Sequence, residues 1–228
     1  MSGHWREEKS NVSRKIIFCI LLSGIPCFTW FILMSGWSED VFGRSCSTIQ
    51  SILILITWDI YVARVIYSLY GLLPRSSPWN EVLTVSFFLY IIAGTNILSA
   101  LYYSPEWKEN WIIDGMGMML YLFGSFLTTW SEQTRAWWKR KPENKGKLYT
   151  EGLFGVVRHP NYLGDAILFT GLVLVTRVWW NLWVPIVMVI GFIFHHISDN
   201  ENYLSNRYKQ YWPAYIKQTP YKLFPFIY

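Results

Sequence analysis

Long apolar runs fill most of this sequence and restrict it to folds that place them in a membrane. Four runs are each long enough to cross about 30 Å of hydrocarbon as a helix. They lie near residues 16–34, 48–72, 80–102 and 111–130. A fifth run, 164–197, is too long for one ordinary span and contains a polar and aromatic break at 177–181. We therefore predict two tightly connected helices there, roughly 164–177 and 181–197, and about six spans in total.

The composition supports a membrane protein. Hydrophobic residues make up 52% of the 228 residues and charged residues only 15%, whereas soluble domains carry about 25% charged residues. The 14 Trp residues are typical of a protein with side chains at the membrane–water interface. The sequence shows no alternation of strands and helices and no dinucleotide-binding glycine motif, so we expect no Rossmann domain. We predict an all-α polytopic membrane helix bundle that forms one integral membrane domain over residues 1–228.

The distribution of Lys and Arg predicts the topology. The first 15 residues are polar and mixed in charge, and no cleavage site for a signal peptide follows them. If the N-terminus is inside, the inside segments hold 16 of the 20 Lys and Arg residues, against three in the outside turns. Cytoplasmic loops carry an excess of these residues, so we expect both termini and the connector 131–163 to face the cytosol.

A basic run lies in this connector. It consists of Lys139, Arg140, Lys141, Lys145 and Lys147. One interpretation is an anchor on anionic lipid headgroups. The other is a site for a phosphate-rich cofactor such as NADPH, with neutral hydrogen bonds from Gln133 and Asn144. Trp137 and Trp138 fit either interpretation, as interfacial anchors or as a stack on adenine.

A dense polar block with the sequence RHPNYLGD, residues 158–165, follows the basic run. Pro160 fixes the local backbone geometry. If a helix begins near it, the unpaired backbone N–H groups at that start favour anions. A helix that begins there places Tyr162 and Asp165 on one face. Gly164 permits close approach of another backbone or of a ligand.

A structural role for the same block is the alternative. In that case Arg158 pairs with Asp165, and His159 bonds to a carbonyl group. The block holds more polar groups than capping a helix requires, which favours a functional site.

Two further polar groups stand out. His195 and His196 precede Asp199 and Glu201, but adjacent histidines do not face one metal ion on a helix, and the three cysteines have no metal-binding spacing. We expect no metal and interpret this group as a polar helix end or a cofactor contact. Asp59 lies inside the second apolar run, where a charge is costly. It is a candidate substrate-binding residue, and the alternative is a structural bond to Tyr61 or to a neighbouring span.

The segment from Ser131 to Asp165 resembles the signature of the steroid 5α-reductase C-terminal-domain superfamily, which includes sterol C14 and C7 reductases and isoprenylcysteine carboxyl methyltransferases. The tail from Tyr208 to Tyr228 resembles the sterol-reductase tail. The matches cover about a third of the chain. They comprise Gln133, Pro142 to Lys147 (PENKGK), Gly152 to Phe154 (GLF) and the RHPNYLGD block.

The resemblance implies a membrane oxidoreductase that transfers a hydride from NADPH to a carbon–carbon double bond of a steroid-like or other lipid. It implies a cytosolic-side cofactor region formed by 131–165 and 195–228. The cofactor-binding positions carried over are Gln133, Lys139, Asn144, Lys147, Arg158, Asn161, Asp165 and Glu201. One departure concerns the tail helix, where sterol reductases usually carry Arg-Asp-Glu and this chain has Asp199-Asn200-Glu201.

The alternatives are a membrane methyltransferase that uses S-adenosylmethionine, and a non-catalytic membrane scaffold. The basic run favours NADPH, because S-adenosylmethionine has no phosphates. As a mechanism we expect Tyr162, or secondly His159, to act as the proton donor. Arg158 and Lys147 would then bind phosphates, and Asp165 would orient Arg158 or the ribose.

We expect the lipid substrate to enter from the bilayer and expect no nucleic-acid partner. A eukaryotic protein of this kind belongs in the endoplasmic reticulum and a bacterial one in the inner membrane.

Overall fold

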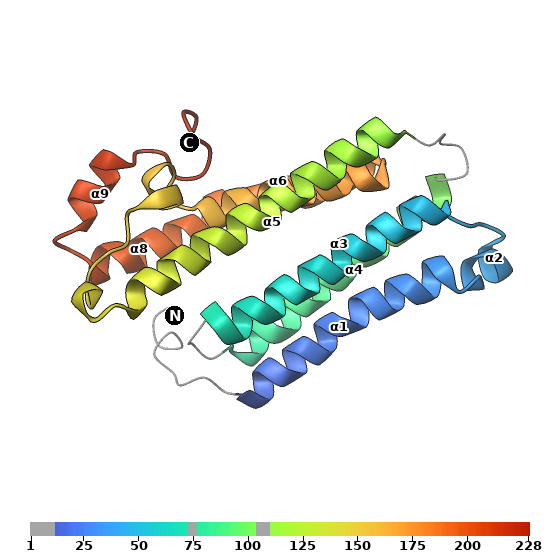
Figure 1. Ribbon diagram of the computed structural model, residues 1–228, viewed down its shortest axis with the longest axis horizontal. Coiled ribbons are helices and arrows are strands. Elements are labelled where there is room, and N and C mark those ends of the chain that lie inside the picture. Colours follow the sequence, from blue (N-terminus) through green and yellow to red (C-terminus); the bar gives the residue numbers. More distant parts are fainter. Residues whose placement is uncertain (1–11, 73–76, 104–109) are drawn as a thin grey trace. The chain divides into compact units, whose positions relative to one another are not determined.

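The computed structural model describes residues 12–72, 77–103 and 110–228, and within these ranges it contains helices and no strand (Figure 1). The predicted all-α class is therefore confirmed. The chain divides into two compact units. The first holds the described residues up to Tyr121 together with Phe169–Val184, and the second holds Leu122–Leu168 and Pro185–Tyr228.

Among the described residues, five helical stretches are long and apolar enough to span a membrane. They are Val12–Met34, Thr48–Leu72, Trp79–Tyr102, Trp111–Arg140 and Trp179–Arg207. Pro160–Thr176 is a shorter apolar helix of the kind predicted near 164–177. The prediction of about six spans thus corresponds to five long helices and one short one.

The first unit is built around α1 (Val12–Met34), which packs against both α3 (Thr48–Tyr67) and α4 (Trp79–Tyr103). The short helix α2 (Trp37–Phe42) follows α1. Lys15 is only 4% exposed and donates from α1 to the carbonyl of Leu69, in the π-helical turn Ser68–Leu72 that ends α3. A lysine at this place satisfies a helix-end carbonyl that has no partner within its own helix.

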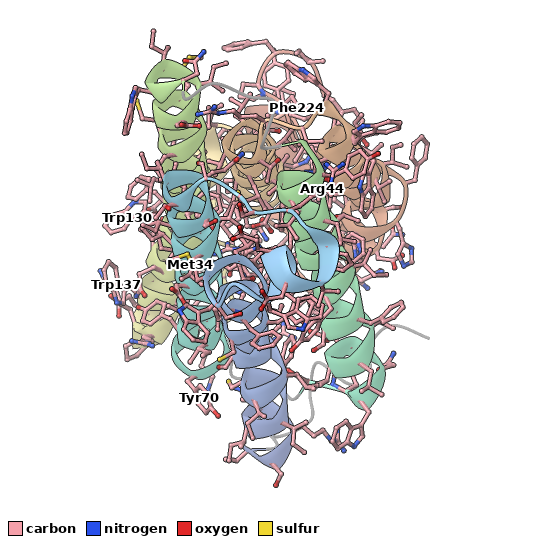
Figure 2. All side chains as sticks on the ribbon, turned by 90° about the vertical axis from the view of Figure 1, so that its right-hand side faces the viewer. Met34, Arg44, Tyr70, Trp130, Trp137 and Phe224 are labelled. Carbon is pink, nitrogen blue, oxygen red and sulfur yellow. The ribbon has the colours of Figure 1, made fainter. Side chains whose placement is uncertain are left out.

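Large apolar side chains cover the outside of these helices. Ile20 on α1, Phe87 on α4 and Leu98 on α4 are 65%, 69% and 59% exposed. Figure 2 shows side chains projecting outward along the helices, Trp130 and Trp137 among them. Such exposure is unfavourable in water but ordinary against lipid tails, so the protein is an integral membrane protein.

The second unit contains the C-terminal part of α5 (Trp111–Arg140), the start of α6 (Pro160–Thr176), most of α7 (Trp183–Gly191), α8 (Ile197–Arg207) and α9 (Trp212–Gln218). Two single 3-10 turns, Pro142–Asn144 and Gly152–Gly155, interrupt the connector as its Pro and Gly residues predict. The π-helical turn Phe192–His196 joins α7 to α8 without a break.

Two helix boundaries differ from the predictions. The helix predicted over 111–130 continues to Arg140, because its polar last turns still pack and include strong helix formers. Gln133 and Lys139 therefore lie on α5 and not in a loop. The helix predicted over 181–197 continues to Arg207 through the π-helical turn.

Pairs of glycines bring α5 and α6 close together. In the second unit, a Cβ added at Gly124 would lie 2.4 Å from the backbone of Gly164 and of Leu168. In the first unit, a Cβ added at Gly171 would lie 2.7 Å from the carbonyl oxygen of Gly117. Contacts between small residues let helix backbones approach in a membrane, where no hydrophobic effect drives helices together. The close approach predicted for Gly164 is therefore made with another backbone.

We expect Gly124→Ala to lower the free energy of unfolding by about 2 kcal/mol, because the two helices must separate to admit a methyl group. The matched control is Gly115→Ala on the same helix, where an added Cβ meets nothing within 4 Å. Thermal unfolding in detergent measures both variants. Equal unfolding temperatures would show that close packing at Gly124 contributes nothing.

Candidate functional site

The RHPNYLGD block lies in the second unit, where its first residues run beside the C-terminal tail. The backbone N–H of Arg158 donates to the carbonyl of Tyr221 at 2.9 Å, and that of His159 donates to Lys222 at 3.0 Å. Pro160 then begins α6, four residues before the start predicted near residue 164, and proline is well tolerated in a first helical turn. Two segments more than 60 residues apart in sequence are thus fixed to each other.

The side chain of Arg158 is buried and holds this arrangement. Its Nε donates to Glu201 Oε1 at 2.7 Å. Its Nη1 donates to the carbonyls of Thr219 at 2.9 Å and Pro220 at 3.2 Å. With the residue only 8% exposed, the guanidinium binds the tail and α8 rather than projecting toward solvent. The expectation that Arg158 reaches a phosphate is not supported by this position.

Glu201 is the acidic centre of the site. Its Oε1 also lies 3.5 Å from His159 Nε2, and its Oε2 lies 3.8 Å from Lys222 Nζ. One carboxylate therefore faces an arginine, a lysine and a histidine. The proposed pairing of Arg158 with Asp165 is wrong in that the carboxylate holding Arg158 comes from α8, 43 residues further along the chain.

Asp165 instead faces α5. The hydroxyl of Thr128 lies 3.2 Å from Asp165 Oδ1 and 3.0 Å from the carbonyl of Asn161. This contact ties the first turn of α6 to α5, beside the close approach of Gly124 and Gly164. A role for Asp165 in orienting Arg158 directly does not follow from the geometry.

Three aromatic rings form a stack at the start of α6. The rings of His159 and Tyr162 lie 5.3 Å apart and 11° from parallel, and those of Tyr162 and Phe192 lie 4.5 Å apart and 10° from parallel. Phe192 belongs to the π-helical turn, and such turns occur often at functional sites. The stack fixes the direction of the Tyr162 hydroxyl, since the ring cannot tilt without displacing both neighbours.

The imidazole of His159 is 2% exposed, and its Nε2 makes no hydrogen bond that meets geometric criteria, despite lying 3.5 Å from Glu201. We regard this contact as electrostatic and not as a full hydrogen bond. Burial lowers the pKa of His159 below its ordinary value, and the neighbouring Glu201 carboxylate opposes this shift without reversing it. His159 is therefore neutral at neutral pH.

The basic run lies in solvent, in contrast to Arg158. Its five members are all exposed: Lys139, Arg140, Lys141, Lys145 and Lys147. Lys139 Nζ lies 3.5 Å from the hydroxyl of Tyr208, while Asn144 donates to the carbonyl of Trp138 at 2.8 Å and so caps the end of α5. Gln133 is buried on α5, with 6% exposure.

The two connector tryptophans behave differently. Trp138 packs against Tyr149 with ring centroids 5.3 Å apart, so its surface is used internally. Trp137 is 49% exposed and meets Trp130 edge to face, and both point outward from α5 (Figure 2). This placement fits an interfacial anchor better than a stack on adenine.

The sequence did not predict the buried contacts that the C-terminal tail makes in the second unit. Leu223 is fully buried with Phe192 and Ile197. Tyr215 is buried and donates to the carbonyl of Phe154 at 3.0 Å, and this burial raises its pKa. The resemblance of the tail to sterol reductases was the one signal that pointed to these contacts.

The other candidates lie elsewhere. His195 and Asp199 are exposed and 3.7 Å apart, and the described residues hold no group of three or more His, Cys, Asp or Glu arranged for a metal. Asp59 is exposed on α3 of the first unit, and its substrate role remains a prediction.

Fold and site together define a polytopic membrane protein whose C-terminal region is organised by an RHPNY block. Residues 76–219 match the family described as protein of unknown function (DUF1295), and the chain belongs to this family. A Delta(14)-sterol reductase of Arabidopsis thaliana is 31% identical over 98 residues, which are 42% of this chain and 26% of that protein. The chain thus aligns with about a quarter of this sterol reductase.

Two relatives align over longer stretches. The 3-oxo-5-alpha-steroid 4-dehydrogenase 2 of Rattus norvegicus is 27% identical over 161 residues, 68% of this chain and 61% of that protein. The protein-S-isoprenylcysteine O-methyltransferase B of Arabidopsis thaliana is 26% identical over 141 residues, 57% of this chain and 68% of that protein. The superfamily predicted from the sequence is confirmed, with reductases and methyltransferases both among the relatives.

We expect Arg158→Ala to destabilise the second unit by about 3 kcal/mol, because it leaves Glu201 without its closest partner and frees two carbonyls. Lys145→Ala, at an exposed site, is the control and leaves stability unchanged within about 0.5 kcal/mol. Denaturant unfolding in detergent compares them. Wild-type stability in Arg158→Ala would refute the structural role.

The neutral, buried state of His159 predicts a pH dependence. The unfolded chain takes up a proton near the ordinary histidine pKa of 6.5, before the folded protein does. The free energy of unfolding should therefore decrease as pH falls below about 6.5. His159→Gln should flatten this slope, and His195→Gln, at a side chain that is 72% exposed, should retain it. If the free energy of unfolding of His159→Gln depends on pH as in the wild type, groups other than His159 cause the pH dependence.

Proposed function

We propose that the protein is an NADPH-dependent membrane reductase that adds a hydride and a proton across a carbon–carbon double bond of a lipid. The observation that carries the proposal is the exposed basic run, Lys139 to Lys147, in the segment that leads into the buried His159–Glu201 site. Five cations in nine residues suit the pyrophosphate and 2′-phosphate of NADPH. The steroid and sterol reductases among the relatives support the same reaction.

The residues present fit this cofactor. Lys147 and its neighbours expose the charge that phosphates require, and His159 keeps an unpartnered, buried nitrogen. The remaining candidate contacts are Gln133, Asn144 and Asn161, whose amides provide neutral donors and acceptors. When bound, NADPH would supply the hydride. The cofactor region then comprises 131–165 and 195–228.

Within this mechanism Tyr162 is the proton donor. Its ring is fixed between His159 and Phe192, so the phenolic hydroxyl keeps one orientation, from which it would protonate the substrate carbon that does not receive the hydride. His159 is the second candidate donor. Arg158 and Glu201 serve the site by holding the block, α8 and the tail together, and so act as positioning residues. Asp59 remains a candidate substrate contact.

A methyltransferase that uses S-adenosylmethionine is the second candidate. The isoprenylcysteine methyltransferase, which aligns over more than half of the chain, favours it. S-adenosylmethionine carries no phosphate and gains little from the basic run, which is why we prefer the reductase. We further propose a cytosolic location for both termini and the basic run, in the endoplasmic reticulum of a eukaryote or the inner membrane of a bacterium. The steroid-like substrate would enter from the bilayer.

A side-by-side titration of the purified protein tests the cofactor. We expect NADPH to bind at least tenfold more tightly than S-adenosylmethionine, with an affinity that falls as salt rises, since exposed charges are screened. The double variant Lys145→Ala with Lys147→Ala should lower the affinity for NADPH about tenfold, because each lost charge removes about 0.7 kcal/mol of binding free energy. The control is Lys217→Ala, exposed on α9. If S-adenosylmethionine binds more tightly than NADPH, the reductase proposal is wrong and the methyltransferase becomes the preferred function.

A further inference from the structure

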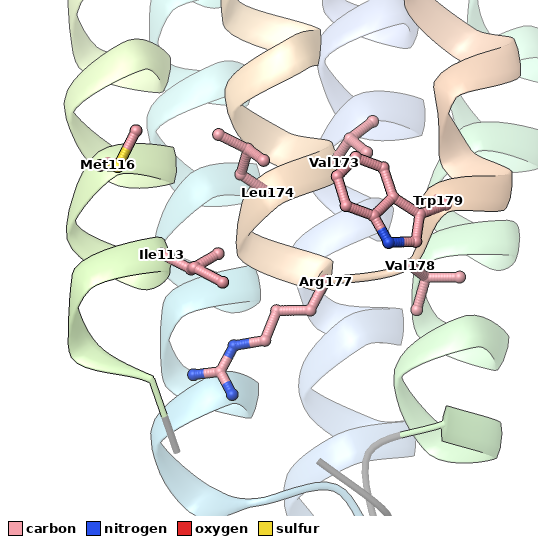
Figure 3. Close-up of a pocket in the computed structure, with 7 residues that line it drawn as sticks. All are labelled: Ile113, Met116, Val173, Leu174, Arg177, Val178 and Trp179. Carbon is pink, nitrogen blue, oxygen red and sulfur yellow. The ribbon is translucent and has the colours of Figure 1, made fainter. Parts of the chain in front are cut away.

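An apolar cavity of about 200 Å³ lies at the C-terminal end of α6 in the first unit. Ile113 and Met116 on α5 point toward Leu174 on α6 (Figure 3). Val173 and the turn formed by Arg177, Val178 and Trp179 complete the lining. No part of the RHPNYLGD block belongs to this lining.

The one charged group of the lining is already neutralised. Arg177 Nε donates to Asp114 Oδ1 at 2.8 Å, and Nη2 contacts Oδ2, so the pair is bidentate. Both side chains are buried, with 7% and 8% exposure. In Figure 3 the guanidinium extends from the end of α6 toward the first turns of α5. The lining therefore offers no unpaired charge to a ligand, which fits an uncharged, apolar occupant.

The size and chemistry of the lining define the occupant. A cavity of about 150 Å³ lined by aliphatic and aromatic side chains stays dry and binds a hydrocarbon such as benzene. The cavity here is larger and equally apolar along its walls, so it accommodates a stretch of hydrocarbon and disfavours water. A polar headgroup would lose its hydration there without compensation.

The exposed side chains around the cavity indicate where the occupant comes from. Trp179, Trp180 and Trp111 are 67%, 71% and 65% exposed, and tryptophans of this kind lie at membrane–water interfaces. Met116, which lines the cavity, is 54% exposed, so the cavity opens on the outer side of the helices. Such an opening meets the acyl chains of the surrounding bilayer.

We propose that this cavity is a binding site for one acyl chain of a bilayer phospholipid, whose headgroup remains at the interface beside Trp179. The bound chain excludes water from the Asp114–Arg177 pair and so strengthens it, because charges attract more strongly where the local dielectric constant is low. Arg177 adopts a positive φ of 54°, a conformation that non-glycine residues rarely take. Because Arg177 belongs to the turn between α6 and α7, a stronger ion pair stabilises the strained conformation of that turn.

Photolabelling tests the site. The protein is placed in bilayers containing a phosphatidylcholine with a photoactivatable acyl chain, and the label on residues 173–178 is quantified by mass spectrometry. We expect labelling in the wild type and its loss in Met116→Trp, where the indole fills the opening. Met119→Trp is the matched control, since Met119 lies on the same helix, is 73% exposed and is outside the lining.

Thermal unfolding first confirms that both variants are folded, and Met116→Phe replaces Met116→Trp if the indole prevents folding. Equal labelling of the Met116 and Met119 variants would overturn the proposal, as would an unlabelled 173–178 segment in the wild type. Labelling by a photoactivatable free fatty acid but not by the phospholipid would overturn the identity of the occupant.

Discussion

The ion pair between Arg158 and Glu201 is the interaction on which the second unit depends. Arg158 begins the polar block, Glu201 lies on α8, and the same guanidinium binds two carbonyls of the tail. A buried charge pair of this kind contributes little net stability by itself, but losing either partner leaves an uncompensated charge. Its value lies in fixing three distant segments in one arrangement, with His159 and Tyr162 held between them.

The charged residues of the proposed cofactor site fall into two groups. Arg158 and Glu201 hold the block, α8 and the tail together, whereas the exposed cations of the connector are the ones that we propose for the cofactor. In the proposed mechanism, the basic run attracts the cofactor at long range, and the RHPNYLGD block holds the proton donor in one orientation.

Much of the fold follows from local patterns in the sequence. Apolar run lengths predicted the long helices, although α6 begins at Pro160 and not near residue 164. The site was less accessible, because its contacts join residues far apart in the chain. Nothing local distinguishes Glu201 from Asp165 as the partner of Arg158, and nothing local shows that Leu223 is buried. The extension of α5 to Arg140 was missed because hydropathy marks where lipid ends, and a helix can continue into water.

The π-helical turn between α7 and α8 has a geometric consequence for this site. A π turn holds one residue more than an α-helical turn, so every side chain after it is rotated by about 100° relative to an uninterrupted helix. Without the wider turn at Phe192–His196, the face of α8 that carries Glu201 would point in another direction. The length of the chain in this one turn, more than the identity of its residues, therefore sets the angle at which the carboxylate meets its cations.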